Sequence, residues 1–277
     1  MRRNRIIVLL IGVALFCSCQ TEDLTNLGVL YSERIKQLKD YPEYKDDGIS
    51  IPFTYDLNRR DLYESIIKEY KLDEITAGYS DVDLMIVLLN WVCNNFKHDG
   101  KSAFPILNDS ITIMKFSKAS PNGINCRLLA IMLAELCRLY GIEAKHISGF
   151  PKEGFGRYVH VVTQAYSKKY DQWILLDPTY RLYLKNAKGD YLNLASLRES
   201  VINGEEIYAN ANAGHNGRRF NMYSYKRFMI DFLFCFTCTT DYSFGSDGRE
   251  NLLVPVDFFD VREKVTTTSA NVFWATP

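Results

Sequence analysis

A cysteine stands where a helix is predicted to begin, directly after a tight turn. Residues 120–123, Ser-Pro-Asn-Gly, are typical of a turn, and the apolar residues after them recur with helical spacing up to Gly141. Cys126 lies in the first turn of that helix, where backbone N–H groups lack helical partners and the helix dipole is positive. A thiolate is stabilised there, so Cys126 is a candidate nucleophile. Cys137, three turns along, fits burial on the apolar stripe instead.

Two β-rich runs downstream predict a hairpin that carries a histidine and a carboxylate. Residues 160–166 and 172–177 flank a polar turn at 167–170. The register set by this turn places His160 directly opposite Asp177, with Cβ atoms ~5 Å apart on one face of the sheet. The carboxylate could then accept a hydrogen bond from the imidazole. Taken singly, the histidine also fits a buried core position and the aspartate a strand-end cap.

Other segments predict the elements that must position these three side chains. Helical periodicity is found at residues 31–38, 62–72, 82–92 behind a Ser80 cap, and from Asp109 or Ser110 to about 116. A strand is predicted at 142–147 and a loop at 149–156. His98 and His146 have no predicted partner, and His215 lies in a Gly- and Asn-rich loop that could cover a site, although a solvated loop is the simpler interpretation.

Four short motifs surround the candidate residues: N-G-I-N-C at 122–126, L-Y-G-I-E-A at 139–144, H-V-V at 160–162 and W-I-L-L-D-P-T at 173–179. Together they resemble the transglutaminase-like superfamily of cysteine enzymes, and the order Cys, His, Asp with spacings of 34 and 17 residues agrees with it. The resemblance implies an α+β, papain-like fold in which the nucleophile helix packs on an antiparallel β-sheet. It covers about residues 81–179 closely. Residues 193–277 resemble, more loosely, the C-terminal part of transglutaminase-like lipoproteins of gut bacteria.

Each member of the predicted triad has a chemical role. Cys126 would be the nucleophile, its thiol pKa lowered below about 8.5 by the helix N-terminus and a charged imidazole. His160 would take the proton during attack and return it to a leaving amine. Asp177 would accept a hydrogen bond from the other ring nitrogen, which fixes the tautomer and stabilises the charged ring.

The oxyanion formed during acyl transfer needs hydrogen-bond donors. The backbone N–H of Cys126 is the first expected donor. A second would come from a side chain, and the candidates are Asn122, Asn125 and Trp91. Asn122 equally fits a turn former and Trp91 a core anchor, so the second donor stays open.

The N-terminus resembles a bacterial lipoprotein signal. Arginines at positions 2, 3 and 5 precede an apolar run at 6–16, and F-C-S-C follows at 16–19. The resemblance implies cleavage after Ser18 and lipidation of Cys19, which would anchor the protein to a membrane of the bacterial cell envelope, facing either the periplasm or the outside. A plain secretory signal or a short anchor is the alternative.

Composition narrows the possible partners and cofactors. The chain has 277 residues with 33 basic and 33 acidic side chains, so no basic field indicates nucleic acid. No acidic loop of the calcium-binding kind is present, and no metal or other cofactor is expected. Cys235 and Cys238 form a C-x-x-C pair, but the apolar run around Cys235 predicts a buried strand rather than a zinc or redox site.

The sequence therefore predicts an enzyme of thiol-mediated acyl transfer on a peptide or protein amide, with hydrolysis favoured over cross-linking. The alternative is a catalytically silent, lipid-anchored module that binds peptide or glycan in the same cleft. The expected organisation is a signal peptide (1–18), a tether and helical extension (19–80), a catalytic core (81–190) and a C-terminal extension packed on the core (191–277).

Overall fold

The computed structural model describes residues 30–40, 48, 51–105, 107–152, 158–244, 246, 250–253 and 265–277. The chain divides into two compact units, residues 1–41 and 42–277. Residues 30–39 form a helix, which confirms the helix predicted at 31–38. The predicted signal segment and Cys19 lie outside the described residues. Within the described part of the chain, no helix is both long and apolar enough to cross a membrane.

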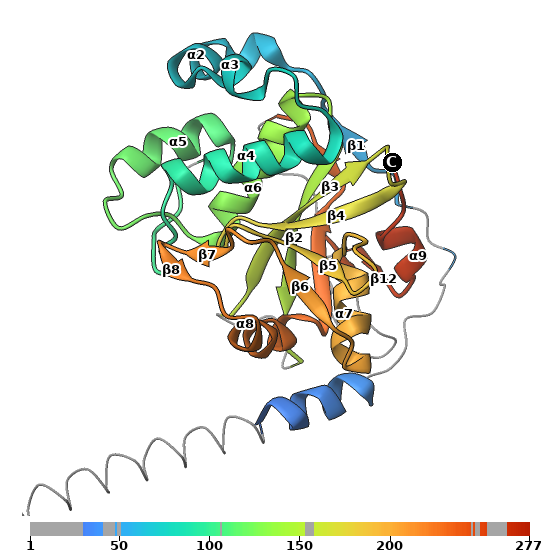
Figure 1. Cartoon of the computed structure of the whole chain (residues 1–277). Helices are drawn as coiled ribbons and strands as arrows, with labels where there is room; N and C mark the ends of the chain where they lie inside the picture. Colours follow the sequence, from blue (N-terminus) through green and yellow to red (C-terminus); the bar gives the residue numbers. More distant parts are fainter. Residues whose placement is uncertain are drawn as a thin grey trace, which may run out of the picture. The chain divides into compact units, whose positions relative to one another are not determined.

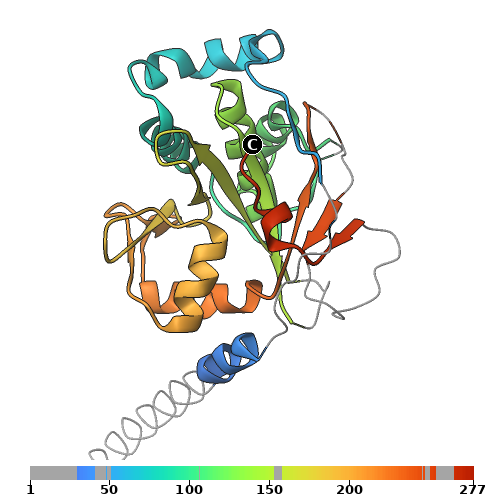
Figure 2. The ribbon, with the colours of Figure 1, turned by 90° about the vertical axis from the view of Figure 1, so that its right-hand side faces the viewer.

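The larger unit is built on one large sheet (Figures 1 and 2). Its eight described strands run in the order β12-β11-β9-β2-β3-β4-β5-β6. Every neighbouring pair is antiparallel except β11 and β12, which are parallel. The strands are β2 Ala144–Phe150, β3 His160–Ser167, β4 Gln172–Asp177, β5 Leu182–Asn186, β6 Ile207–Ala209, β9 Cys235–Thr239, β11 Glu250–Leu253 and β12 Val265–Thr267.

Two short pairs complete the strands, and helices surround the sheet. Parallel β1 (Thr54–Tyr55) and β10 (Asp241–Tyr242) form one pair, and antiparallel β7 (Gly214–His215) and β8 (Arg218–Arg219) the other. The helices are α2 Arg60–Tyr70, α3 Leu72–Thr76, α4 Asp81–Asn95, α5 Ser110–Lys118, α6 Cys126–Leu139, α7 Leu194–Asn203, α8 Met222–Met229 with the 3-10 helix η1 Ile230–Phe232, and α9 Ala270–Phe273. The predicted α+β fold is confirmed, and the large sheet is antiparallel in its described part apart from the β11–β12 pair at one edge.

Helix α6 lies at the centre of the unit. Residues 128–139 are all buried, because α6 contacts β2 and β3 of the sheet and also α4 and α5. The polar atoms of this interface are paired as well: the Thr163 hydroxyl on β3 donates to the Ala130 carbonyl at 2.8 Å. The helix ends at a left-handed glycine, Gly141 (φ 77°), as its position in the sequence predicts.

The start of α4 differs from the predicted cap. Ser80 occupies the N-cap position, but its side chain makes no capping hydrogen bond. Asp81 takes that role in a left-handed conformation (φ 49°), and its carboxylate accepts from the Val82 N–H at 2.8 Å and the Lys169 N–H at 3.2 Å, as well as from the Ser167 hydroxyl. The helix start is therefore fixed by the β3–β4 turn, a contact that a local capping rule does not include.

The β3–β4 hairpin has a register two residues away from the prediction. Ser167 pairs with Gln172, because the loop closes one residue later, at left-handed Asp171 (φ 51°). Asp177 therefore lies opposite the residue two positions after His160, and the directly opposed pair predicted from the sequence is wrong. A shift of two residues keeps every side chain on its face, so the histidine and the carboxylate remain diagonal neighbours within reach of each other.

Two strand boundaries also differ from those predicted from the sequence. Strand β2 continues to Phe150, into the segment predicted as a loop, because β9 pairs with it at residues 148–150. The predicted buried strand at the C-x-x-C pair is confirmed, with Cys235 and Cys238 both buried in β9. It begins later than the apolar run because η1 occupies residues 230–232.

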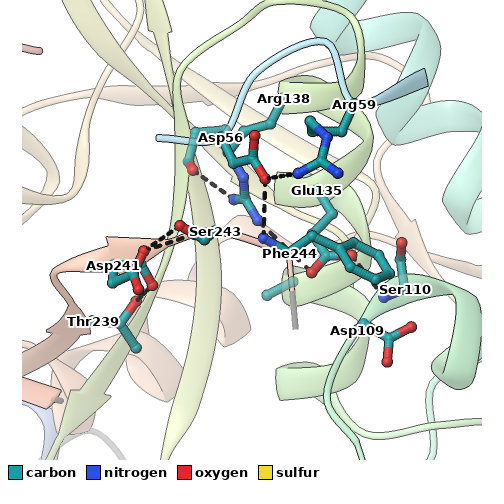
Figure 3. Close-up of polar contacts among 12 residues, drawn as sticks. Asp56, Arg59, Asp109, Ser110, Glu135, Arg138, Thr239, Asp241, Ser243 and Phe244 are labelled. Atoms are coloured by element: carbon teal, nitrogen blue, oxygen red, sulfur yellow. Dashed lines mark hydrogen bonds and ion pairs between the residues drawn. The ribbon is translucent and has the colours of Figure 1, made fainter. Parts of the chain in front are cut away.

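Two charged residues of α6 are buried together (Figure 3). A nitrogen of Arg138 lies 3.8 Å from an oxygen of Glu135, and each side chain is 7% exposed. Glu135 accepts from the Tyr63 hydroxyl and from the Ser110 N–H, both at 2.7 Å. Arg138 donates to the Ala144 carbonyl at 2.8 Å. The pair thus joins α6 to α2, to the start of α5 and to β2.

Replacing Glu135 by alanine is expected to lower the free energy of unfolding by about 3 kcal/mol, because it leaves Arg138 buried without its carboxylate. Urea denaturation followed by circular dichroism measures the change. The matched control is Glu69→Ala, which removes a carboxylate from the exposed Lys118 pair at 2.8 Å and should cost less than about 1 kcal/mol. Equal losses in the two variants would contradict the buried network's role.

Candidate active site

Cys126 is the first residue of α6, and its neighbours fix that helix start. The Asn125 side chain accepts from the Leu128 N–H at 3.1 Å and caps the helix. The thiol is half-buried, and its sulfur lies 3.9 Å from the Val159 carbonyl, the residue before His160. The predicted position of the cysteine, at a positive helix end, is confirmed.

A close backbone approach at Gly123 brings a second segment to this helix start. Gly123 has φ 121°, and a Cβ there would lie 2.3 Å from the Lys97 carbonyl oxygen. The Ile124 N–H donates to the same oxygen at 2.9 Å, and the Asp99 N–H donates to the Ile124 carbonyl at 2.8 Å. Glycine is required because only a residue without a Cβ allows this contact. The contact holds His98 next to the start of α6.

The structure brings His160 and Asp177 together. His160 Nε2 lies 2.8 Å from Asp177 Oδ2, and both residues are buried. The carboxylate also accepts from the Tyr225 hydroxyl at 3.1 Å and from the Thr179 N–H at 3.0 Å. Since Nε2 faces the carboxylate, Nδ1 is the ring nitrogen left for the Cys126 thiol. The structure thus brings the three residues predicted as a triad together, with the carboxylate bonded to the imidazole and the imidazole acting on the thiol.

Aromatic rings enclose the His160 imidazole. Ring centroids of Phe228, Phe232 and Tyr180 lie 4.9, 5.9 and 6.2 Å from it. These rings come from α8, η1 and the turn after β4, so the C-terminal part of the chain completes the site. They fix the plane of the imidazole and keep water from the bond between His160 and Asp177.

Electrostatics favour the charged forms of both the thiol and the imidazole. Burial alone would raise the pKa of Cys126, but hydrogen bonds from His160 and His98 lower it to about 6. Burial would lower the pKa of His160, but the charge and hydrogen bond of Asp177, with a smaller contribution from Cys126, raise it to about 10. A thiolate next to an imidazolium is therefore the resting form near neutral pH.

His98 is a site residue that sequence reasoning missed. Its Nδ1 lies 3.1 Å from His215 Nε2. Asn216 holds its backbone on both sides: the His98 N–H donates to Asn216 Oδ1 at 2.9 Å, and Asn216 Nδ2 donates to the His98 carbonyl at 2.8 Å. Of the histidines without a predicted partner, this one contacts Cys126, and the loop of His215 does lie beside the site. The only signal for His98 in the sequence was Gly123. A glycine suggests a close backbone contact but does not identify the segment that makes it.

The three predicted oxyanion donors occupy different surroundings. Asn122 is exposed in the turn before α6. Asn125 directs its side-chain oxygen at the α6 backbone as the cap. Trp91 is buried on α4, with edge-to-face contacts to Tyr70 and Phe96 at centroid distances of 5.3 and 5.7 Å. Among the described residues, no group of three or more His, Cys, Asp or Glu side chains could hold a metal ion.

The family model described as the transglutaminase-like superfamily matches residues 71–178. These residues form a transglutaminase-like core. Cys126, His160 and Asp177 all fall within that core, and the predicted family resemblance is confirmed. No curated protein matches the chain.

Solved structures that resemble the chain include three with low sequence identity. A "Putative Cysteine Protease from Cytophaga hutchinsonii" has 15% identity and a TM-score of 0.33, with 61% of this chain and 56% of that chain covered. A structure named as a TGase has 18% identity and a TM-score of 0.30 (43% and 31% covered). A "Putative Protease from Parabacteroides distasonis" has 16% identity and a TM-score of 0.29 (47% and 28% covered). The chain thus spans little more than half of the first structure and about a third or less of the others.

The low pKa of Cys126 predicts its reactivity with iodoacetamide. The alkylation rate should fall as pH drops through about 6, because the thiol becomes protonated there. In His160→Ala the half-maximal rate should shift up toward about pH 8.5, the ordinary thiol range. Peptide mass mapping follows the label, and Cys137 is the internal control because burial raises its pKa to about 12. An ordinary thiol profile at Cys126 that His160→Ala leaves unchanged would refute the assembled pair.

Proposed function

We propose that this protein is a cysteine amidase or peptidase that cleaves peptide or protein amides through Cys126, His160 and Asp177. The observation that carries the proposal is the arrangement of the three side chains: a thiol at a helix N-terminus, whose pKa is lowered by an imidazole that lies with Nε2 2.8 Å from a buried carboxylate. If these residues served only to stabilise the fold, burying a charged histidine next to a half-buried thiol would cost desolvation free energy and give nothing in return.

The proposed reaction has two steps. The Cys126 thiolate attacks the amide carbonyl carbon, the C–N bond breaks, and His160 Nδ1 gives its proton to the departing amine, leaving a thioester. Water then attacks the thioester carbonyl, His160 takes a proton from that water, and the carboxylic acid is released with the thiolate restored. Asp177 keeps the imidazole oriented through both proton transfers. No cofactor takes part.

Hydrolysis is favoured over transfer to an amine because water is always available to a thioester. Cross-linking requires a second site that binds an amine and excludes water. The lipoprotein-like sequence at residues 1–19 supports a lipid anchor on Cys19. The substrates would then be peptides or proteins of the bacterial cell envelope.

His98 is proposed as the second oxyanion donor, in place of Asn122, Asn125 and Trp91. It hydrogen-bonds the Cys126 thiol from outside the triad, and its Nδ1 is held by His215 at 3.1 Å. The other ring nitrogen, Nε2, can therefore donate toward an oxygen that forms next to the sulfur. Together with the Cys126 N–H it would complete the pair of donors that acyl transfer needs.

Turnover of a fluorogenic peptide library should be detectable in the wild type and absent in Cys126→Ala. In H₂¹⁸O the released acid should carry ¹⁸O, and an added primary amine should leave most product as acid. Mass spectrometry measures both. If most of the product were instead the amide of the added amine, the reaction would be transamidation and not hydrolysis. Peptide binding without any turnover would favour the silent binding module.

Replacing His98 by leucine should reduce kcat about 100-fold with little change in KM, because the lost donor serves the transition state rather than the bound substrate. His98→Gln keeps an N–H donor of similar reach and should retain more of the rate. Steady-state kinetics compares the two variants, with circular dichroism to check folding. A folded His98→Leu variant with the wild-type kcat would exclude His98 from the oxyanion site.

A further inference from the structure

A cleft of about 320 Å³ has His98 among its lining residues. One wall is the end of α4 with Cys93, another is the turn after β4 at residues 178–181, and the third is the β7–β8 hairpin at 212–219. Figure 1 shows this hairpin beside the chain that leaves α4. His98 lines the cleft and is also one of the two imidazoles that lower the pKa of the Cys126 thiol, so this histidine connects the cleft with the cysteine.

The charge of the cleft has one sign. Arg181, Arg218 and Arg219 line it, and no aspartate or glutamate does so within the described part of the chain. Arg218 and Arg219 are exposed and Arg181 is half-buried, with one nitrogen bonded to the Asn94 side chain. Burial raises the pKa of the Cys93 thiol to about 12, so it stays neutral. Three arginines therefore line the cleft, and no described lining residue carries a carboxylate.

One residue that lines the cleft has a buried hydroxyl without a hydrogen-bond partner among the described residues. Thr179 is 4% exposed and lines the cleft, and its Oγ1 has no hydrogen-bond partner among the described residues. Its backbone N–H already bonds Asp177 at 3.0 Å, so the hydroxyl is the group left unsatisfied. A buried polar atom without a partner costs free energy that a ligand oxygen would recover.

We propose that this cleft binds a carboxylate of the substrate, so that the preferred amide bond lies next to an acidic side chain or near a chain-terminal carboxylate. The proposal rests on the proposed function, which makes the substrate a peptide or protein. In such a substrate the anions are carboxylates, and guanidinium groups pair with them by charged, often bidentate, hydrogen bonds. The Thr179 hydroxyl would donate to the same group.

The kinetic test uses pairs of fluorogenic peptides that differ only at one position near the cleaved bond. One peptide of each pair has glutamate there and the other has glutamine, and successive pairs test successive positions. A second pair compares a free C-terminus with its amide, which separates side-chain from terminal carboxylates. At one position, or for the free terminus, kcat/KM should be about tenfold higher for the acidic peptide. The preference should weaken as salt is raised.

The variants assign any preference to the cleft. It should collapse in the double variant Arg218→Gln/Arg219→Gln and shrink in Thr179→Val, which removes the hydroxyl but keeps the shape. The matched control, Arg60→Gln, removes an arginine that pairs with Asp73 on α3, outside the cleft. It should keep the preference. Turnover with no acidic preference at any position, or a preference that survives in the double variant, overturns the proposal and leaves the proposed function standing.

Binding to Cys126→Ala, measured by calorimetry with the same peptides, separates the two failures. Tighter binding of the acidic peptides, lost in Cys126→Ala/Arg218→Gln/Arg219→Gln, supports the carboxylate site. If the wild type nevertheless cleaves none of the peptides, the proposed function fails while the carboxylate site stands. Equal binding of acidic and neutral peptides overturns the cleft proposal whatever the turnover. Circular dichroism confirms that each variant is folded.

Discussion

The packing of α6 against β2 and β3 is the constraint on which the site depends. Cys126 is at the first position of α6 and His160 at the first position of β3, so the separation of thiol and imidazole is set by how the helix sits on the strand. The Thr163 hydroxyl bonds the Ala130 carbonyl at 2.8 Å one turn from the nucleophile. Glu135 and Arg138 hold the other end of the helix. Burial of residues 128–139 leaves the helix little freedom to slide or rotate.

The C-terminal part of the chain supplies the surroundings that determine the acid–base properties of the site. Asp177 is buried, and outside its own turn it accepts from His160 and from Tyr225 of α8. Phe228 and Phe232 cover the imidazole ring. These side chains lower the dielectric around the histidine while the carboxylate supplies the compensating charge. The family match ends at residue 178, so the enclosure of the triad is built by residues beyond it.

Local signals in the sequence predicted the parts of the site that local chemistry determines. The turn before Cys126, the Asp109 cap and the stop at Gly141 are each read from a few neighbouring residues, and each is confirmed. The hairpin register was wrong by two because a left-handed Asp171 is not required by its residue type. The predicted side chains still lie on the correct face of the sheet because a register error of two residues, unlike an error of one, does not exchange the two faces.

Contacts between distant segments explain what sequence reasoning missed. His98 and His215 are 117 residues apart and meet at 3.1 Å, and neither residue type nor spacing indicates that contact. Gly123 lets the chain before His98 approach closely, and the Asn216 side-chain amide bonds the His98 backbone on both sides. Neither residue indicates from the sequence which segment it meets. A periodic pattern reports which face of an element is buried but does not identify what covers that face. The second imidazole at the thiol was therefore visible only in three dimensions.

The surroundings of Cys126 differ on its two sides, and this difference limits how a substrate can approach. His160 is enclosed by aromatic rings and bonded to a buried carboxylate, so its imidazole is shielded from solvent. His98 opens instead onto a cleft lined by arginines. A thiolate repels anions, and positive side chains next to it reduce that repulsion. In the proposed reaction, the proton-transfer side of the sulfur is then separate from the side where a charged substrate would lie, and His98 is the residue that links the thiol to the cleft.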